Sequence, residues 1–261
     1  MPKFVFFLFL VFITANLRAQ TWEFGGTVGA AGYMGDLNPN NPLKPSGISF
    51  GAFTQRNFDG YWSAKIQYTF GQIAADDKNS SDPQFRARNL SFNTKLNEVA
   101  LIGEFNFFRY IPEVGQNRFT PFIYAGVGVV GYSPTANYQG HTYDLRSLMT
   151  EGQSKPYPGG ALTMPYGAGI KYNFSGKWNF TVDIGYRHPR TDYLDDVSGN
   201  YATKNKFTDP VAQALSDRSG ENTGVYIGAA GTQRGDLRPH DTYWFIGLSI
   251  SFTIISSKCY Y

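Results

Sequence analysis

The sequence is poor in charge and in cysteine, and after its first residues it has no long apolar segment. Charged residues make up 16% of the chain, below the roughly 25% of soluble domains. Its 23 basic and 20 acidic residues form no block of one sign, which gives nucleic-acid binding little electrostatic support. A single cysteine excludes an internal disulfide. Beyond Ala19, no run reaches the roughly 18 apolar residues that a membrane-spanning helix needs.

A secretory signal is predicted at the start of the chain. Lys3 provides a positive charge, and the apolar run Phe4–Ile13 is too short to span a bilayer as a helix. Small and polar residues follow up to Ala19, after which we expect cleavage. Residues 1–19 are therefore predicted to be a signal peptide, residues 20–255 an outer-membrane β-barrel, and residues 256–261 a periplasmic tail.

The barrel is predicted from segments in which apolar and polar residues alternate. In Tyr61–Gln72, for example, Trp62 and Ile66 face one way and Lys65 the other. A secreted globular domain is the alternative, but 17% aromatic residues and 29 glycines favour a wall between lipid and lumen. We therefore predict an all-β fold, an eight-stranded antiparallel transmembrane β-barrel of the outer membrane. The predicted spans are Trp22–Tyr33, Ile48–Arg56, Tyr61–Gln72, Leu96–Phe108, Phe119–Tyr132, Met164–Phe174, Trp178–His188 and Thr242–Ile254.

The connections between these spans are alternately long and short. The first, Met34–Gly47, is long, the second, Asn57–Gly60, is short, and the last, Pro189–Asp241, is the longest. Outer-membrane barrels have short periplasmic turns and long outer loops. Because the predicted number of strands is even, both termini are expected in the periplasm.

Aromatic residues near the ends of the spans are expected to form two girdles at the lipid–water boundary. The predicted periplasmic girdle consists of Trp22, Tyr61, Trp62, Phe107, Phe119, Tyr172, Phe174 and Trp178. The predicted outer girdle consists of Tyr33, Tyr68, Phe70, Tyr132, Tyr166, Tyr186, Tyr243 and Trp244.

Charged residues within the spans all fall on the polar faces. The interior of an eight-stranded barrel is just wide enough for side chains to fill it, and an unpaired buried charge is unfavourable. We therefore expect lysine or arginine to pair with carboxylates across a filled interior, in preference to an open ion channel. The predicted lumen charge network consists of Glu23, Lys65, Glu98, Glu104, Lys171, Asp183 and Arg187.

The histidines suggest no reaction chemistry. His188 ends a predicted span near Asp183 and Asp192, but no serine is spaced to act as its nucleophile. The other two, His141 and His240, lie in predicted loops. We expect a rim histidine at the barrel mouth, no catalytic residue and no cofactor.

Acidic residues in the connections offer the oxygen ligands that Ca²⁺ takes. The candidates are Asp76, Asp77, Asp192, Asp195, Asp196 and Asp236. None has the spacing of a known calcium loop, so we expect solvated carboxylates and no metal site. In the last connection, Asp209 before Pro210 predicts the start of a short surface helix.

The one cysteine, Cys259, lies in the predicted tail after the last span. The periplasm is oxidising, and an unpaired thiol in an exported protein indicates either pairing with another protein or a reactive group. Two interpretations stay open, an incidental thiol and a disulfide to a periplasmic partner.

Several short runs, taken in order, resemble one family. They are Tyr33–Asn38, Pro165–Tyr172, Thr191–Ser198, Gln233–Asp236 and Ser257–Tyr261. These runs are similar to the PorG-type outer-membrane proteins of the type IX secretion system, and the likeness extends through the mature chain. No single run is a biochemical motif, so the resemblance rests on their order and on the barrel around them.

The resemblance implies a non-catalytic part of a secretion machine, in bacteria whose gliding motility often depends on the same machinery. The implied partners are a periplasmic ring lipoprotein of the PorK type and its PorN-type partner, besides outer-membrane lipid and lipopolysaccharide. The implied role is to anchor this ring to the outer membrane, and Cys259 is suitably placed for a tether. The alternatives are a lipid-A-modifying hydrolase and a free-standing barrel for adhesion or as a small pore.

Overall fold

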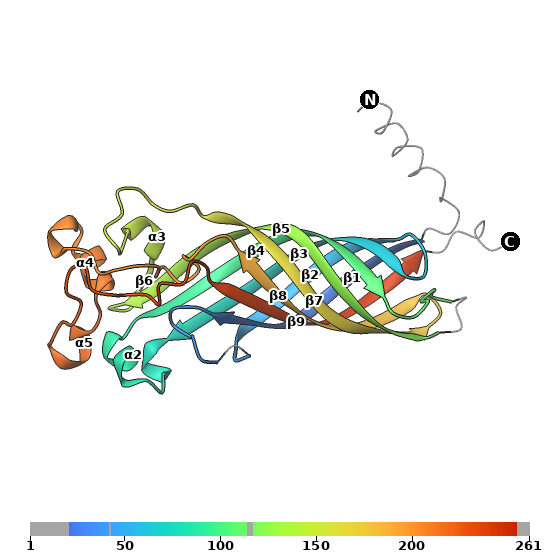
Figure 1. Cartoon of the computed structure of the whole chain (residues 1–261), viewed down its shortest axis with the longest axis horizontal. Coiled ribbons are helices and arrows are strands. Elements are labelled where there is room, and N and C mark those ends of the chain that lie inside the picture. Colours follow the sequence, from blue (N-terminus) through green and yellow to red (C-terminus); the bar gives the residue numbers. More distant parts are fainter. Residues whose placement is uncertain (1–20, 42, 114–116, 255–261) are drawn as a thin grey trace, which may run out of the picture.

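The chain forms an antiparallel β-sheet that closes into a barrel (Figure 1). The computed structural model describes residues 21–41, 43–113 and 117–254. The strands are β1 (Thr21–Met34), β2 (Pro45–Asn57), β3 (Trp62–Asp76), β4 (Ser91–Asn106), β5 (Phe119–Tyr138), β6 (His141–Asp144), β7 (Gly160–Ser175), β8 (Trp178–Pro189) and β9 (Thr242–Ile254).

Each wall strand pairs with its neighbours in the sequence, and pairing of β1 with β9 closes the ring. The sheet has nine strands, but the short β6 pairs only with β5, so eight strands form the wall. The predicted eight-stranded antiparallel barrel is confirmed. The predicted signal peptide and periplasmic tail, residues 1–19 and 256–261, lie outside the described residues.

The predicted spans coincide with the wall strands, but several strands continue further toward the long loops. β4 begins at Ser91 instead of Leu96, and β5 ends at Tyr138 instead of Tyr132. Backbone pairing between β3 and β4 continues without interruption to the pair formed by Asp76 and Ser91. The strands are longer than predicted because this pairing persists where the apolar alternation has ended.

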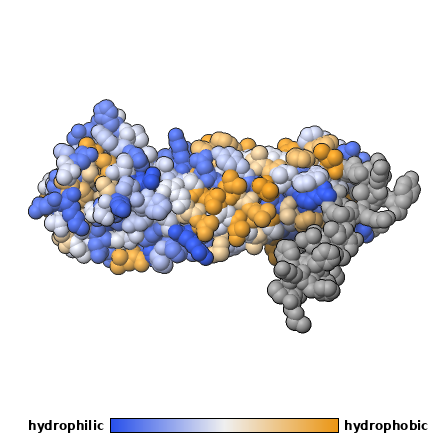
Figure 2. Space-filling model, turned by 90° about the horizontal axis from the view of Figure 1, so that it is seen from above, coloured by the Kyte–Doolittle hydropathy of each residue, from blue (hydrophilic) through white to orange (hydrophobic). Residues whose placement is uncertain are grey.

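The wall alternates between an apolar outer face and a polar inner face. On β3, Ile66 as a whole residue is 54% exposed, whereas its neighbour Lys65 is 6% exposed. Figure 2 shows apolar side chains gathered over the barrel wall and hydrophilic ones over the loop end. All members of the predicted periplasmic girdle are exposed on the wall, as expected. Within the described ranges, no helix is both long enough and apolar enough to cross a membrane.

The predicted outer girdle is wrong for half of its members. Tyr33, Tyr132, Tyr243 and Trp244 are almost completely buried. Tyr33 lies an even number of positions from Glu23, so the two side chains share the inner face of β1. Trp244 shares the outer-facing parity of β9, but its ring occupies the space above Gly32 on the paired strand. Proximity to a strand end was therefore a poor guide, because parity and loop packing decide exposure.

Small residues on the inner face make room for large ones opposite. A β-carbon added at Gly185 of β8 would overlap the hydroxyl of Tyr124, which reaches across from β5. This hydroxyl donates a hydrogen bond to Asp183 on the same strand as the glycine, at 3.1 Å. The lumen is therefore packed by side chains at this level.

The long loops form a cap at one end of the barrel (Figure 1). Buried loop residues such as Leu145, Leu194 and Leu215 join one apolar cluster with inward-facing residues at the strand tops, including Tyr33 and Phe245. The cap therefore fills the loop end of the lumen. Its helices are η1 (Asp77–Asn79), α2 (Pro83–Arg88), α3 (Leu145–Leu148), η2 (Lys204–Lys206), α4 (Pro210–Ser216) and α5 (Gly220–Thr223).

One of these helices was predicted. α4 begins at Pro210, and the Asp209 carboxylate accepts a hydrogen bond from the Val211 backbone N–H at 2.8 Å. This is the expected N-cap.

Candidate functional site

In the half of the lumen nearer to the short turns, buried polar side chains surround Glu104 of β4. Its carboxylate binds the ammonium group of Lys171 from β7, and its Oε2 atom lies 3.7 Å from Nζ of Lys65 on β3. The Ser63 hydroxyl donates to the same carboxylate at 3.2 Å, and the Gln55 amide does so at 3.3 Å. One buried carboxylate thus faces two buried cations.

A second group lies nearer to the cap, around Glu98. Nε of Arg187 lies 3.5 Å from its Oε1 atom, and the Tyr243 hydroxyl donates to Oε2 at 2.5 Å. All three side chains are almost fully buried. The Arg187 guanidinium also stacks 4.5 Å from the ring centre of Phe245.

The remaining two members of the predicted network are held by neutral groups. Glu23 accepts hydrogen bonds from the Ser251 hydroxyl and from the Asn57 amide, the latter at 3.3 Å. Asp183 accepts the hydroxyl of Tyr124. Within the described ranges, neither carboxylate has an ion pair with lysine or arginine. The seven residues therefore lie in the lumen as two ion-paired groups and two separate carboxylates.

Two buried arginines hold the cap together. Arg88 of α2 forms an ion pair with Asp77 at 2.7 Å and donates to the backbone oxygens of Arg234 and Asp36 at 2.7 and 3.0 Å. Arg234 pairs with Glu151 at 3.1 Å. These contacts join segments that are far apart in the sequence. Arg234 belongs to one of the resembling runs, but no sequence pattern predicted that either arginine would be buried in an ion pair.

A cluster of aspartates lies between these segments. Asp36, Asp192 and Asp241 each bring a carboxylate oxygen within 4.8 Å of the others. The Tyr33 hydroxyl joins the cluster by donating to Asp195 and, at 3.3 Å, to Asp241.

The expectation of solvated loop carboxylates is wrong for four of the six predicted candidates. Asp77, Asp192, Asp195 and Asp196 are all buried. They are buried because the last long loop folds back onto the strand tops, which is a long-range arrangement. Two aspartates that sequence analysis missed, Asp36 and Asp241, are each 1% exposed.

Burial makes the ionised form of these aspartates unfavourable. Loss of hydration is the main cause that raises the pKa of Asp36 to about 7 and the pKa of Asp192 to about 6. The pKa of Asp241 is also raised well above its ordinary range, first by burial and then by the charges of Asp36 and Asp192. Bound protons or a cation must therefore compensate the negative charge of the three aspartates.

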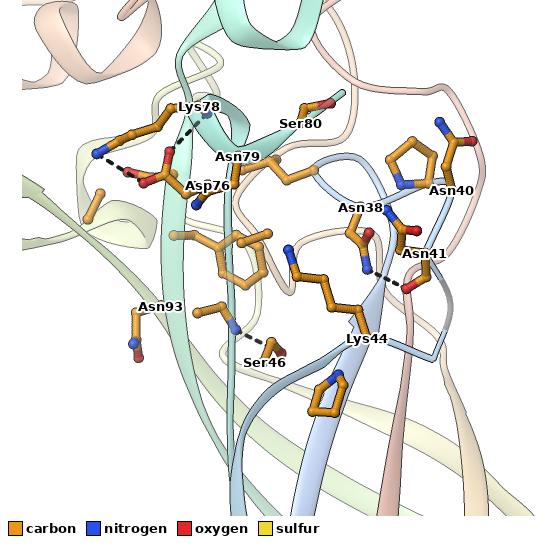
Figure 3. A pocket seen from close by; sticks show the side chains of 18 of the residues that line it. Asn38, Asn40, Asn41, Lys44, Ser46, Asp76, Lys78, Asn79, Ser80 and Asn93 are labelled. Atoms are coloured by element: carbon orange, nitrogen blue, oxygen red, sulfur yellow. Dashed lines mark hydrogen bonds and ion pairs between the residues drawn. The ribbon is translucent and has the colours of Figure 1, made fainter. Parts of the chain in front are cut away.

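A separate pocket of about 460 Å³ opens on the outside of the cap (Figure 3). It lies between the β1–β2 loop and the ends of β3 and β4, and amide, hydroxyl and ammonium groups line it. Lys78 forms an ion pair with Asp76, with 3.1 Å between Nζ and Oδ2. The Asn38 amide donates to the backbone oxygens of Tyr33 and Asn41 at 2.7 and 2.9 Å. Several of the polar groups in the pocket wall thus support the loop itself.

The histidines lie at the loop end of the barrel. The rings of His188 and His240 meet edge to face, with centroids 5.4 Å apart, whereas His141 is exposed on β6. In the part of the chain that the structure describes, no hydrogen bond joins His188 to a serine or a carboxylate. The contacts of His188 therefore differ from those of an activated serine nucleophile.

A closed wall with an apolar outer face, an exposed aromatic girdle at one end and a packed polar interior defines an outer-membrane β-barrel. The chain matches the family model described as "Domain of unknown function (DUF6089)" over residues 2–211, and it belongs to this family. No curated protein matches the sequence.

Comparison with solved structures gives distant likenesses. Neisserial surface protein A (NspA) is 9% identical with a TM-score of 0.45, and the match covers 88% of this chain and 96% of that one. OprG from Pseudomonas aeruginosa is 10% identical with a TM-score of 0.42 and coverages of 92% and 98%. The outer-membrane enzyme PagL is 13% identical with a TM-score of 0.35 and coverages of 89% and 99%. These values are too low to carry an argument about function.

Proposed function

We propose that the protein is a non-catalytic outer-membrane component of the type IX secretion system, which anchors the periplasmic PorK/PorN ring to the outer membrane. The proposal starts from the resemblance to PorG-type proteins. The observation that carries it is that three of the resembling runs, dispersed in the sequence, pack together at the barrel mouth.

Specific contacts join these runs. The Tyr33 hydroxyl donates to Asp195 of the run Thr191–Ser198, across 162 positions of the sequence. Asp36 accepts the backbone N–H of Asp236 across 200 positions. Arg234 donates to the backbone oxygen of Asp196 at 2.8 Å. Short runs that build one buried unit are better support for a family likeness than runs scattered over the surface.

The short-turn end of the barrel is where we place the ring contact. Trp22 at the start of β1 pairs with Ile254 at the end of β9, so both chain ends leave the wall on this side. With the long loops outside the cell, this end faces the periplasm. Cys259 lies outside the described residues, and a disulfide from this thiol to the ring is part of the proposal.

Affinity purification from detergent-solubilised membranes tests the anchor. Ring subunits of the PorK and PorN type should copurify with the tagged barrel, and deletion of the gene should abolish type IX secretion. Unchanged secretion in the deletion strain, or a barrel that purifies without ring subunits, would count against the proposal.

The thiol is tested separately by non-reducing electrophoresis. A higher-mass adduct should be present in the wild type and absent from Cys259→Ser, with Ser257→Ala as the matched tail control. If the adduct is missing but the ring still copurifies, the anchor is non-covalent. An altered lipid A profile in His188→Ala would instead favour the hydrolase alternative.

A further inference from the structure

Three neighbouring strand ends bring the aspartate cluster together. Asp36 follows β1, Asp192 follows β8, and Asp241 immediately precedes β9. These strands are adjacent in the sheet, in the order β1, β9, β8. The cluster therefore joins the β1–β2 loop to both ends of the longest loop, at residues 190–241.

One oxygen of the cluster has no partner. The Asp36 carboxylate accepts the Asp236 backbone N–H through Oδ1, whereas Oδ2 is buried without a hydrogen bond or ion pair. The whole residue is 1% exposed, so solvent does not compensate this oxygen. Buried polar atoms are normally satisfied, and an exception points to a missing water or ion.

The charges around the cluster do not balance. Arg88 is paired with Asp77, and Arg234 with Glu151. Among the described residues, no lysine or arginine forms an ion pair with Asp36, Asp192 or Asp241. The guanidinium of Arg88 lies near this region, but the hydrogen bond that it donates to Asp36 goes to the backbone oxygen, at 3.0 Å. A cation is the group that would satisfy both the free oxygen and the excess of negative charge.

We propose that Asp36, Asp192 and Asp241 bind one Ca²⁺ ion at the barrel mouth. Ca²⁺ takes six to eight oxygen ligands at about 2.3–2.6 Å, so two oxygens on opposite sides of the ion lie about 4.8 Å apart. The three carboxylate oxygens fit within this separation. The set contains only carboxylates, which favours a hard cation over zinc or copper. Bidentate binding and water complete the coordination.

The ion stabilises the cap by linking its loops. It fastens the β1–β2 loop to the segments that lead into and out of the longest loop. Tyr33 touches Asp241 through its hydroxyl, so an aromatic ring lies beside the ion. Bound Tb³⁺, which replaces Ca²⁺ in oxygen sites, should therefore emit when the protein's aromatic rings are excited.

The site is tested on the full mature protein in detergent micelles after EDTA treatment. Calorimetric titration should show one Ca²⁺ bound per chain, and excess Ca²⁺ should quench the Tb³⁺ emission. Asp36→Asn should weaken Ca²⁺ binding at least about tenfold, since it removes a charge but keeps the oxygen that accepts the Asp236 N–H. The matched control is Asp144→Asn, an exposed aspartate whose side chain makes no capping hydrogen bond. Equal binding by Asp36→Asn and the wild type would overturn the proposal.

A measurement on the wild type keeps the proposal testable if the variants fold poorly. Lys204 and Lys206 lie exposed in the longest loop and offer trypsin sites. A ligand at 100 times its dissociation constant lowers the open population about 100-fold, so saturating Ca²⁺ should slow cleavage there at least about tenfold. Cleavage that Ca²⁺ leaves unchanged contradicts the inference. Protection by Mg²⁺ but not by Ca²⁺ rejects the assignment to Ca²⁺.

Discussion

Replacing Glu104 by Gln tests whether the barrel interior is packed and dry. The glutamate side chain is fully buried, and those of Lys65 and Lys171 are only 8% and 4% exposed. Glutamine keeps the size of the side chain and an oxygen for the Ser63 hydroxyl. It removes the one carboxylate that faces both lysines, so two buried charges lose their counterion.

The size of the effect depends on the state of the lumen. Removing one partner of a buried ion pair destabilises a protein by about 3–5 kcal/mol, whereas exposed ion pairs contribute about 0–1 kcal/mol. We expect Glu104→Gln to lower the free energy of unfolding by about 3 kcal/mol or more. Replacing Lys171 by Met in the same chain should restore part of the loss, because one unpaired charge then disappears.

Equilibrium unfolding in detergent micelles, followed by tryptophan fluorescence, measures this change. The matched control is Glu221→Gln, which breaks the more exposed pair with Arg218 at 2.8 Å in the cap. We expect a loss below about 1 kcal/mol for the control. If Glu104→Gln loses no more than the control, the lumen is wet enough to screen its charges, and the argument for a packed interior is refuted.

Three further predictions concern the wall and the cap. Gly185→Ala should lower the free energy of unfolding by about 1–3 kcal/mol, because its methyl group overlaps the facing tyrosine, and Gly103→Ala, with no contact nearer than 3.8 Å, serves as the control. In EDTA, the protection of the cap amides, which is their exchange rate relative to the unfolded chain at the same pH, should fall as pH rises from about 4 to about 7. Burial raises the pKa of Asp36 to about 7 in the folded state, so over this range the unfolded chain releases the proton first and the folded state loses stability; a protection independent of pH would contradict this cause. Arg234→Met should open the cap to trypsin far more than Arg238→Met, because the first side chain is 2% exposed and the second 55%; equal cleavage of both variants would argue against a structural role for Arg234.

The wall could be predicted because its pattern is local. Every wall strand alternates with a period of two, so Lys65 and Ile66 reveal their faces from the sequence alone. Turn lengths then supply the strand order, since a short connection requires neighbouring antiparallel strands. The upper ends of β4 and β5 escaped the prediction, because backbone pairing continues there without the apolar alternation that marks a lipid-facing wall.

The cap could not be predicted, because its contacts join distant segments. Asp195 and Asp196 look like ordinary solvated loop residues in the sequence, yet both are buried beneath the returning loop. Asp36 belongs to a run that resembles a known family, but the backbone N–H that its Oδ1 atom accepts comes from Asp236, 200 positions away. For Tyr33, the sequence does provide the alternation of β1, which places this side chain on the same inner face as Glu23. This alternation is a better guide to the burial of Tyr33 than its proximity to a strand end.

The packed lumen also limits the part that the barrel could take in the proposed secretion role. An eight-stranded barrel leaves an interior about as wide as the side chains that fill it, and here Glu104, Arg187 and Tyr243 occupy that interior while the cap covers one end. Opening a path for a polypeptide would require separating the ion pairs around Glu98 and Glu104 and unpacking the apolar cluster of the cap. The first step would leave buried charges without their counterions, and the second would expose apolar side chains to water. Opening is therefore opposed at several levels of the barrel. If the protein serves secretion, cargo must therefore cross the membrane elsewhere, and the outer wall and short-turn end are the surfaces left for holding a partner.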